Sequence, residues 1–443
     1  MKRFAAPSVL LLFSSVAHAQ DASVKRDVSP ASTEDARMKA LEGQVRTLAG
    51  EVALLRSELK ELRETKSPEP SSGPQVLLAS AHPEPGMLPS SPARAAAQVA
   101  QTQTFGGAPG NAKLLNPDIS LIGDFIGTAG HNNVSPEPSL EMHETEMGLQ
   151  AIIDPYARAD AFISFGETGV NVEEAYVTFT SLPAGLLLKV GKKRADFGKV
   201  NTIHNHALPF IDRPLVTNNL VGGEDGIDDA GFFLSRFLPA PKNWFLEGSA
   251  EVLRGDSDVF HASRRQDVSV VGHLRAYRDL SESTNLDLGV SYARGHNNNG
   301  SNFLTNLYSG DATLRWKPLR RAIYNSFLFR TELFWSARDQ LSAAVPTLFQ
   351  TQHAFGMYSS AEYRVNRRWT VGGRFDRSGH ATDARLTDTG FSGILTYWPS
   401  EFSQIRGQYR FGHLATGPSD FSNANEILFQ VLFVMGAHGA HPF

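Results

Sequence analysis

Residues Phe402–Phe411 have the sequence FSQIRGQYRF, in which side chains of two kinds alternate. In an extended chain one face carries Ser403, Ile405, Gly407, Tyr409 and Phe411. The opposite face carries Phe402, Gln404, Arg406, Gln408 and Arg410. A charge at every second position is costly in the core of a soluble sandwich, whereas it suits a strand between lipid and a wet lumen. The stretch therefore predicts one strand of a transmembrane β-barrel.

The same alternation recurs between Asp118 and the C-terminal end of the chain. It is clearest over Asp267–Tyr277, Tyr308–Trp316 and Trp369–Asp376. Counting such stretches gives about 16 candidate strands between residues 118 and 437, an even number as bacterial single-chain barrels require. After residue 19 no apolar run reaches the roughly 20 residues of a transmembrane helix. We therefore expect an all-β fold, an antiparallel transmembrane β-barrel over residues 116–443, preceded by an α-helical coiled coil.

The N-terminal part of the chain predicts three further segments. Residues 1–19 predict a signal peptide, with a short apolar stretch before the cleavage site Ala17-His18-Ala19. Residues 20–65 predict a periplasmic coiled-coil helix, because apolar residues recur at spacings of three and four from Met38 to Leu62. We expect a homo-oligomer through these heptads, a trimer if the barrel is a porin, although the two valines at a positions favour a dimer. The alternative is a helix that folds back on the barrel. Residues 66–115, rich in Pro, Ser and Ala, predict a linker.

The composition excludes several classes of protein. The chain has no cysteine, which removes disulfides, thiol catalysis and cysteine-based zinc sites. Its net charge of -4 leaves no basic footprint for nucleic acid. It has no Gly-x-Ser-x-Gly motif, and its histidines have no evident serine partner. We therefore expect no enzyme and no bound cofactor, and we expect outer-membrane lipid and a small polar solute as partners.

Several segments resemble a set of proteobacterial porin-like outer-membrane β-barrel proteins. The first are Asn116–Ser120, Gly123–Phe125, Asp154–Asp160, Gly191–Lys192 and Phe197–Asn201. The others are His204–His206, Asp212–Leu215, Thr396–Phe402 and Gly436–Phe443. Members of this set are sometimes labelled zinc-regulated TonB-dependent outer membrane receptors. The overall plan is also similar to that of phosphate-selective porins, which carry an N-terminal coiled coil before a barrel of about this size.

The resemblance and the strand pattern together favour a porin-like channel in the bacterial outer membrane, with the coiled coil in the periplasm. Such a channel would let small polar solutes or ions diffuse across the membrane. Two alternatives remain at this point. One is a non-conducting structural barrel that is tethered through its coiled coil. The other is a zinc-linked uptake receptor, although a TonB-dependent barrel of about 22 strands would leave no residues for a plug domain.

The longest stretch without strand alternation runs from Phe197 to Asp228 and predicts a constriction loop folded into the pore. Its candidate residues are His204, His206, Asp212, Arg213, Glu224 and Asp225. The alternative is an extracellular loop packed on itself. His204-x-His206 and His438-x-x-His441 are weak candidates for metal ligands, and we assign no metal site from the sequence.

The alternation also predicts which charged side chains face the lumen. These pore-lining candidates are Arg158, Asp160, Arg275, Arg315, Arg330, Glu332, Arg374, Asp376, Arg406 and Arg410. The earlier strands add the acids Glu144, Glu146 and Glu174. Rows of opposite sign favour small polar solutes, and a mild anion preference follows if the arginines dominate. The alternative is a set of internal salt bridges that brace the barrel or fill it.

Overall fold

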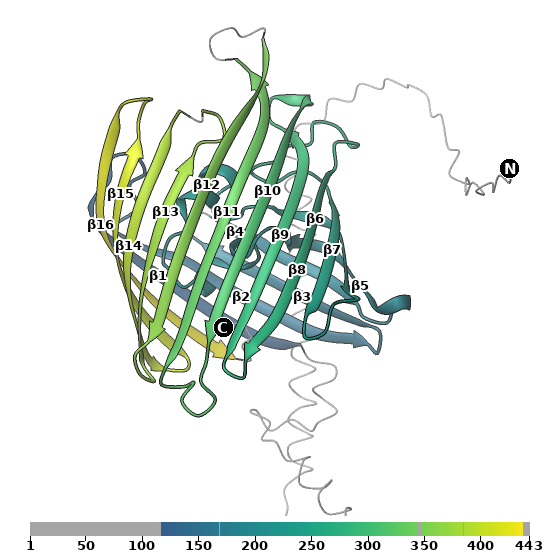
Figure 1. The fold of residues 1–443 in the computed structure, drawn as a ribbon, viewed down its shortest axis with the longest axis vertical. Helices are drawn as coiled ribbons and strands as arrows, with labels where there is room; N and C mark the ends of the chain where they lie inside the picture. Colours follow the sequence, from purple (N-terminus) through teal and green to yellow (C-terminus); the bar gives the residue numbers. More distant parts are fainter. Residues whose placement is uncertain (1–116, 168, 343–347, 384, 437–443) are drawn as a thin grey trace, which may run out of the picture. The chain divides into compact units, whose positions relative to one another are not determined.

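In the computed structural model, which describes residues 117–436 except 168, 343–347 and 384, sixteen strands form a closed barrel (Figure 1). Each strand pairs antiparallel with its neighbours in sequence, and β1 closes the barrel against β16. Within these residues no helix is long and apolar enough to cross a membrane. The predicted all-β barrel is confirmed. The predicted signal peptide, coiled coil and linker lie outside the described residues.

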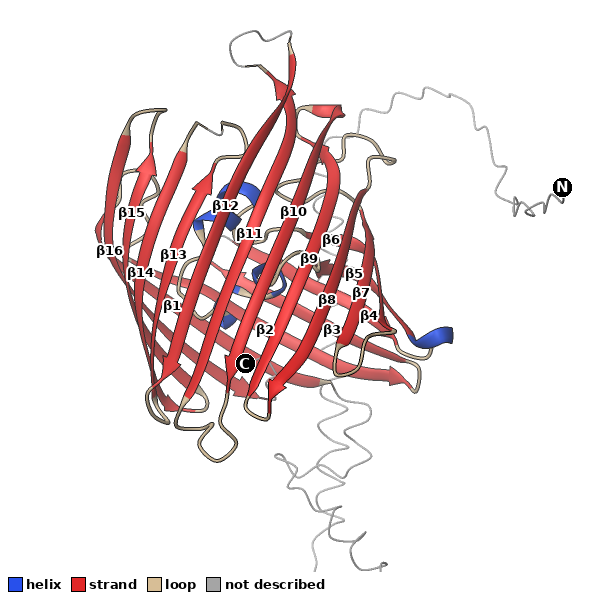
Figure 2. Cartoon of the chain, in the orientation of Figure 1, coloured by secondary structure: helices blue, strands red, loops and turns tan. Residues whose placement is uncertain are grey.

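The strands are joined by turns and loops that include four short helical turns, and Figure 2 distinguishes strands, helical turns and loops by colour. The strands are β1 (Asp118–His131), β2 (Leu140–Asp154), β3 (Ala157–Gly166), β4 (Gly169–Phe179), β5 (Leu186–Arg194), β6 (Asp228–Leu238), β7 (Phe245–Leu253), β8 (Ser269–Ser281), β9 (Thr284–Asn297), β10 (Gly300–Trp316), β11 (Ser326–Leu341), β12 (Phe349–Arg364), β13 (Trp369–Gly379), β14 (Thr387–Ser400), β15 (Ser403–Ala415) and β16 (Phe421–Gly436). The helical turns are η1 (Pro183–Gly185), η2 (Val200–Thr202), η3 (Asn205–Ala207) and η4 (Thr217–Val221).

Strand β16 shows how the sequence divides the two faces of the barrel. Ile427, Phe429 and Phe433 are exposed on its outer face, while Glu426 and Gln430 are buried on its inner face. Since successive side chains of a strand point to opposite faces, this strand presents apolar groups outward and polar groups inward. The outer apolar surface is what a lipid environment requires.

The closing seam between β1 and β16 depends on two glycines. Gly123 pairs with Phe433 and Gly127 pairs with Phe429. Each phenylalanine ring lies directly over the glycine opposite, where a Cβ atom would collide with the ring. The absence of a side chain at both glycines therefore lets the aromatic rings cover the seam, which is how aromatic cross-strand neighbours shield glycine in sheets.

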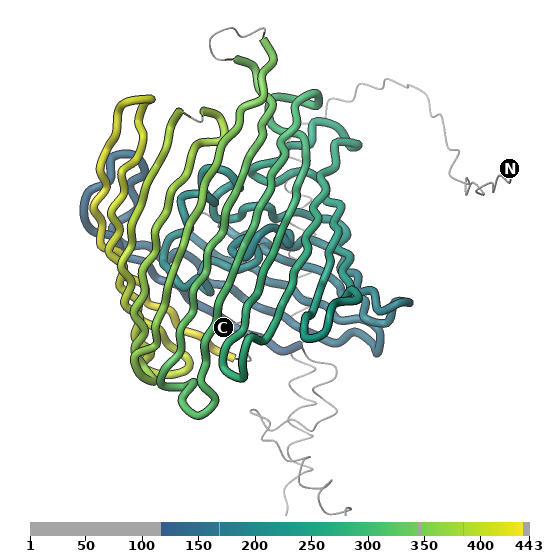
Figure 3. Tube along the Cα trace, viewed as in Figure 1, coloured from purple at the N-terminus to yellow at the C-terminus, as the bar shows by residue number. Residues whose placement is uncertain are grey.

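One connection differs from all the others in length and position. Residues 195–227 join β5 to β6, and we call this segment the inner loop. In Figure 3 its trace winds within the ring of strands, and the contacts described below place it against the inner wall. It contains η2, η3 and η4.

Candidate pore constriction

The inner loop is held inside the barrel first by apolar packing. Phe197, Val200, Phe210 and Val216 of the loop are fully buried. They belong to one cluster with inward-facing wall residues, namely Phe233, Leu253, Val271, Ala293, Leu307, Phe334, Ala354, Tyr358 and Ile394. Burying a side chain of this size contributes about 1.5–3 kcal/mol relative to leaving it in water. The loop therefore has a hydrophobic core of its own within the lumen.

A buried carboxylate on β11 binds the start of the inner loop, which Glu251 of β7 and Ser291 of β9 also bind through the N–H groups of Asp196 and Gly198. Glu332 is fully buried and accepts hydrogen bonds from the backbone N–H groups of Lys199, at 2.7 Å, and Val200, at 3.0 Å. The Tyr358 hydroxyl donates a third, at 2.5 Å. Gly198, with φ of +65°, brings the backbone this close, because a Cβ atom there would lie 2.5 Å from Glu332 Oε2.

We expect Gly198→Val to loosen this attachment. The positive φ costs a residue with a side chain about 1–2 kcal/mol, and the added methyl groups would also displace Glu332. The unfolding temperature in detergent, followed by circular dichroism, should fall clearly below that of the wild type. Gly407→Val is the matched control, because nothing lies near a Cβ atom built on Gly407. Equal losses in the two variants would contradict this view of Gly198.

At Asp212 the inner loop is bound to β13 and β15 by a group of ion pairs that we call the clamp. Asp212 accepts hydrogen bonds from Arg374 Nη2, at 3.0 Å, and from Arg410 Nη1, at 3.0 Å. Arg374 Nη1 also donates to the Asp212 carbonyl at 2.8 Å. Burial raises the pKa of Asp212, but the guanidinium groups of Arg374 and Arg410 outweigh it and hold that pKa well below its ordinary value. The carboxylate is therefore ionised and bridges two strands of the wall.

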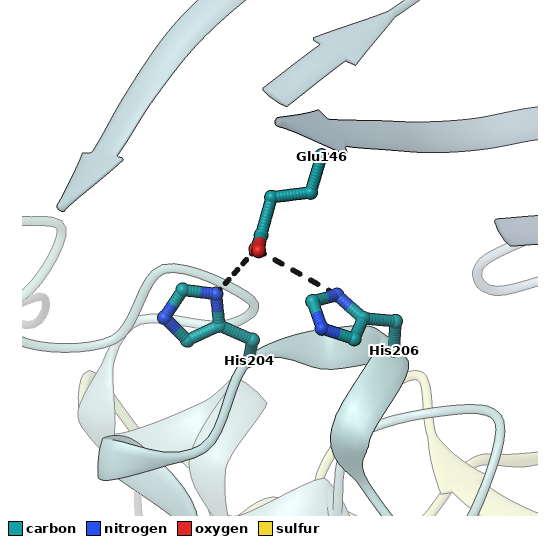
Figure 4. A group of neighbouring side chains, drawn as sticks. All are labelled: Glu146, His204 and His206. Carbon is teal, nitrogen blue, oxygen red and sulfur yellow. Dashed lines mark hydrogen bonds and ion pairs between the residues drawn. The ribbon is translucent and has the colours of Figure 1, made fainter. Parts of the chain in front are cut away.

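Two histidines of the inner loop, His204 and His206, lie against an acidic part of the barrel wall (Figure 4). His204 Nδ1 lies 2.5 Å from Glu146 Oε2 and 3.2 Å from Glu173 Oε2. His206 Nδ1 lies 2.8 Å from Glu144 Oε1 and 3.7 Å from Glu146 Oε2. Burial lowers the pKa of both rings, but for His204 the hydrogen bonds to Glu146 and Glu174 outweigh it and raise the pKa to about 10.

Two β-bulges build this acidic wall. In β2 the pairing moves from Asp124–Glu144 to Phe125–Met142, so that His143 is an extra residue. In β4 the pairing moves from Phe162–Glu174 to Ile163–Val172, so that Glu173 is an extra residue. A bulge re-aims side chains that strict alternation would place on opposite faces. Glu173 and Glu174, although consecutive, are consequently both buried inside the barrel.

The remaining predicted loop residues have structural contacts. Arg213 is buried and donates to the Asn205 side chain and to the carbonyls of Val200 and Ile203, which braces the loop internally. The side chains of Glu224 and Asp225 are more than half exposed. Their carbonyls accept hydrogen bonds from Arg194 at the end of β5. His438 and His441 lie outside the described residues.

A cavity of about 410 Å³ lies between the inner loop and the end of the barrel at which β1 begins and β16 ends. Its loop side is formed by Ile203 and His206–Pro209. Its charged lining residues are Arg315, Lys317, Arg330, Arg364, Arg406, Glu362 and Glu401, so that positive charge predominates. Arg330 is buried, and its Nε and Nη1 atoms have no hydrogen-bond partner among the described residues.

Several of the other predicted pore-lining residues form ion pairs with neighbouring acids. Arg158 pairs with Asp160 on β3, and Arg275 of β8 pairs with Asp287 of β9. Arg374 pairs with Asp376 on β13 as well as with Asp212. Arg410 likewise pairs with Glu426 of β16. Sequence reasoning missed Glu173 and Glu426 as members of this lining, together with the apolar part of the lumen.

No family model matches the chain. An uncharacterized protein of Aquifex aeolicus (strain VF5) is 27% identical over 395 residues, in an alignment that covers 76% of this chain and 82% of that protein. The crystal structure of the outer membrane channel DcaP of Acinetobacter baumannii has a TM-score of 0.50 at 12% identity, covering 72% of this chain and 96% of that one. An anion-selective porin from Comamonas acidovorans has a TM-score of 0.48 at 9% identity, covering 73% of this chain and 100% of that one. The likeness to DcaP shows that this chain shares the barrel fold of an outer membrane channel.

Proposed function

We propose that the protein is a porin-like channel of the bacterial outer membrane, with the inner loop as its constriction. The observation that carries this proposal is the inner loop itself, a charged segment folded into a closed barrel and bound to its wall at β2, β11 and β13. Such a segment sets the diameter and the field of a passage. The proposed role is diffusion of small polar solutes or ions, without catalysis.

The charge of the cavity supports a preference for anions. Five of its charged lining residues are basic and two are acidic, and Arg330 retains unpaired N–H groups. Positive charge on low-dielectric walls raises the local concentration of anions. Because β1 begins at this end, we place the cavity at the periplasmic mouth. A homo-oligomer, with a trimer favoured, remains part of the proposal.

Anion preference is tested by the reversal potential in a planar bilayer under a salt gradient. We expect wild-type protein to prefer chloride over potassium, and Arg330→Gln/Arg406→Gln to shift the reversal potential towards cation preference. Arg385→Gln is the matched control, because Arg385 is exposed in the β13–β14 connection, outside the cavity. An unchanged potential in the double variant, with correct folding shown by heat-modifiable mobility, would contradict the role of the cavity.

A non-conducting structural barrel is the second candidate function. The observation that favours it is the apolar cluster, since the inner loop packs against wall residues of β6–β12 and β14 in the lumen. A folded barrel that never conducts, in the wild type and after release of the inner loop, would favour this candidate over the channel.

A further inference from the structure

Three possible metal-ligand atoms lie together in the barrel interior (Figure 4). They are a carboxylate oxygen of Glu146 and one imidazole nitrogen each of His204 and His206. The three atoms all lie within 4.8 Å of one another, and all three residues are buried. His204 and His206 stand on either side of Asn205 at the start of η3, while Glu146 comes from the wall strand β2. The set therefore forms only when the inner loop is seated.

The distances suit a shared divalent cation. Zinc binds imidazole nitrogen and carboxylate oxygen at about 2.0–2.2 Å, which places neighbouring tetrahedral ligands roughly 3.3 Å apart. His206 Nδ1 lies 3.7 Å from Glu146 Oε2, and His204 Nδ1 lies 3.2 Å from Glu173 Oε2. Glu173, which also pairs with Arg194 at 3.3 Å, is the candidate fourth ligand. The contact of 2.5 Å between His204 and Glu146 has to lengthen, and the three ligand atoms already lie within 4.8 Å of one another.

The surroundings of the group hold the ligands as metal sites do. His204 Nε2 lies 3.5 Å from Glu174 Oε2, so that a carboxylate stands behind the ligating imidazole. An outer carboxylate of this kind orients the ring and strengthens it as a ligand.

The acidic wall supplies a second, independent observation. Asp124, 1% exposed, has an Oδ1 atom without a hydrogen-bond partner among the described residues. With Glu144, Glu146, Glu173 and Glu174 it makes five buried carboxylates, of which Glu173 pairs with Arg194 and Asp124 with His143. Buried charge of one sign is expensive unless cations compensate it.

We propose that Glu146, His204 and His206, with Glu173 as fourth ligand, bind a divalent transition-metal cation that fastens the inner loop to β2 and β4. Imidazole with carboxylate oxygen is a donor set suited to Zn²⁺ and its first-row neighbours. His206 also lines the cavity of about 410 Å³, so that the site borders this cavity. This metal binding does not depend on whether the barrel conducts.

The test is a metal titration of the purified full-length protein in detergent, prepared without a polyhistidine tag and stripped with a chelator. Co²⁺ is the first probe, because its visible absorption reports the ligand geometry, and Zn²⁺ by calorimetry is the second. We expect one equivalent of each to bind, with Zn²⁺ displacing Co²⁺. His206→Gln and Glu146→Gln should abolish this binding, and Glu174→Gln should weaken it by about 10–100-fold.

Two controls locate the binding. His143→Gln changes a neighbouring group, Asp124, His143 and Glu144, whose atoms also lie close enough for a metal. His438→Gln/His441→Gln removes the C-terminal pair. Both should bind as the wild type does, and heat-modifiable mobility checks folding of every variant. No saturable binding by the wild type, binding retained by folded His206→Gln and Glu146→Gln, or binding lost in either control would overturn the proposal.

Discussion

Asp212→Ala should raise the single-channel conductance severalfold. The substitution removes the acceptor shared by Arg374, Arg410 and Gln408, which join the inner loop to β13 and β15. Breaking a buried ion pair by removing one partner costs roughly 3–5 kcal/mol of stability. Here the loss weakens the binding of the inner loop to the barrel wall. Arg374 keeps its ion pair with Asp376, and Arg410 keeps its ion pair with Glu426. We therefore expect the barrel wall itself to stay folded. Planar-bilayer recording measures the conductance.

Asp383→Ala is the matched control for this variant. Asp383 also pairs with an arginine, Arg385, but the pair lies on the surface of the β13–β14 connection. Its conductance should equal that of the wild type. If Asp212→Ala likewise conducts as the wild type does, the clamp has no part in setting the passage.

The low pKa of Asp212 gives the clamp a defined response to pH. A carboxyl group whose pKa is lowered on folding stabilises the structure fully above its ordinary pKa of about 3.9 and loses this contribution only as the pH falls through the lowered value. Mild acidification therefore leaves this clamp closed.

Glu332→Ala should detach the start of the inner loop. The change leaves the N–H groups of Lys199 and Val200 and the Tyr358 hydroxyl without their acceptor in a buried place. Each unsatisfied buried group costs about 1–3 kcal/mol, so the combined loss is among the largest expected from one residue. Limited proteolysis of protein in lipid vesicles should cut the inner loop much faster than in the wild type.

Glu332→Gln separates hydrogen bonding from charge at the same position. It keeps one acceptor oxygen, so that we expect cleavage at a rate between those of the wild type and Glu332→Ala. Equal protection of all three proteins would show that the other contacts of the inner loop hold it in place without Glu332.

The strands could be predicted because their signal is local. Alternation over Phe402–Phe411 depends only on neighbouring residues, and the structure places Gln404, Arg406 and Gln408 inside and Ile405 and Tyr409 outside. The inner loop was also recognisable, since Phe197–Asp228 lacks alternation and lies between two strands.

The parts that escaped prediction depend on exceptions to this alternation. A bulge shifts the faces by one residue, which hides Glu173 and His143 from any count with a period of two. The apolar part of the lumen departs from the wet interior that the alternation predicts. Consecutive apolar residues such as Phe232, Phe233 and Leu234 were its signal, because one of them has to face inward. The clamp at Asp212 joins residues far apart in sequence, which no local pattern reports.

The central claim is that this barrel conducts past its inner loop, and single-channel recording of the purified wild-type protein in a planar bilayer tests it most directly. We predict discrete current steps of one size, carried mainly by anions. A correctly folded and inserted protein that gives no current steps, and gives none after Asp212→Ala, would contradict it.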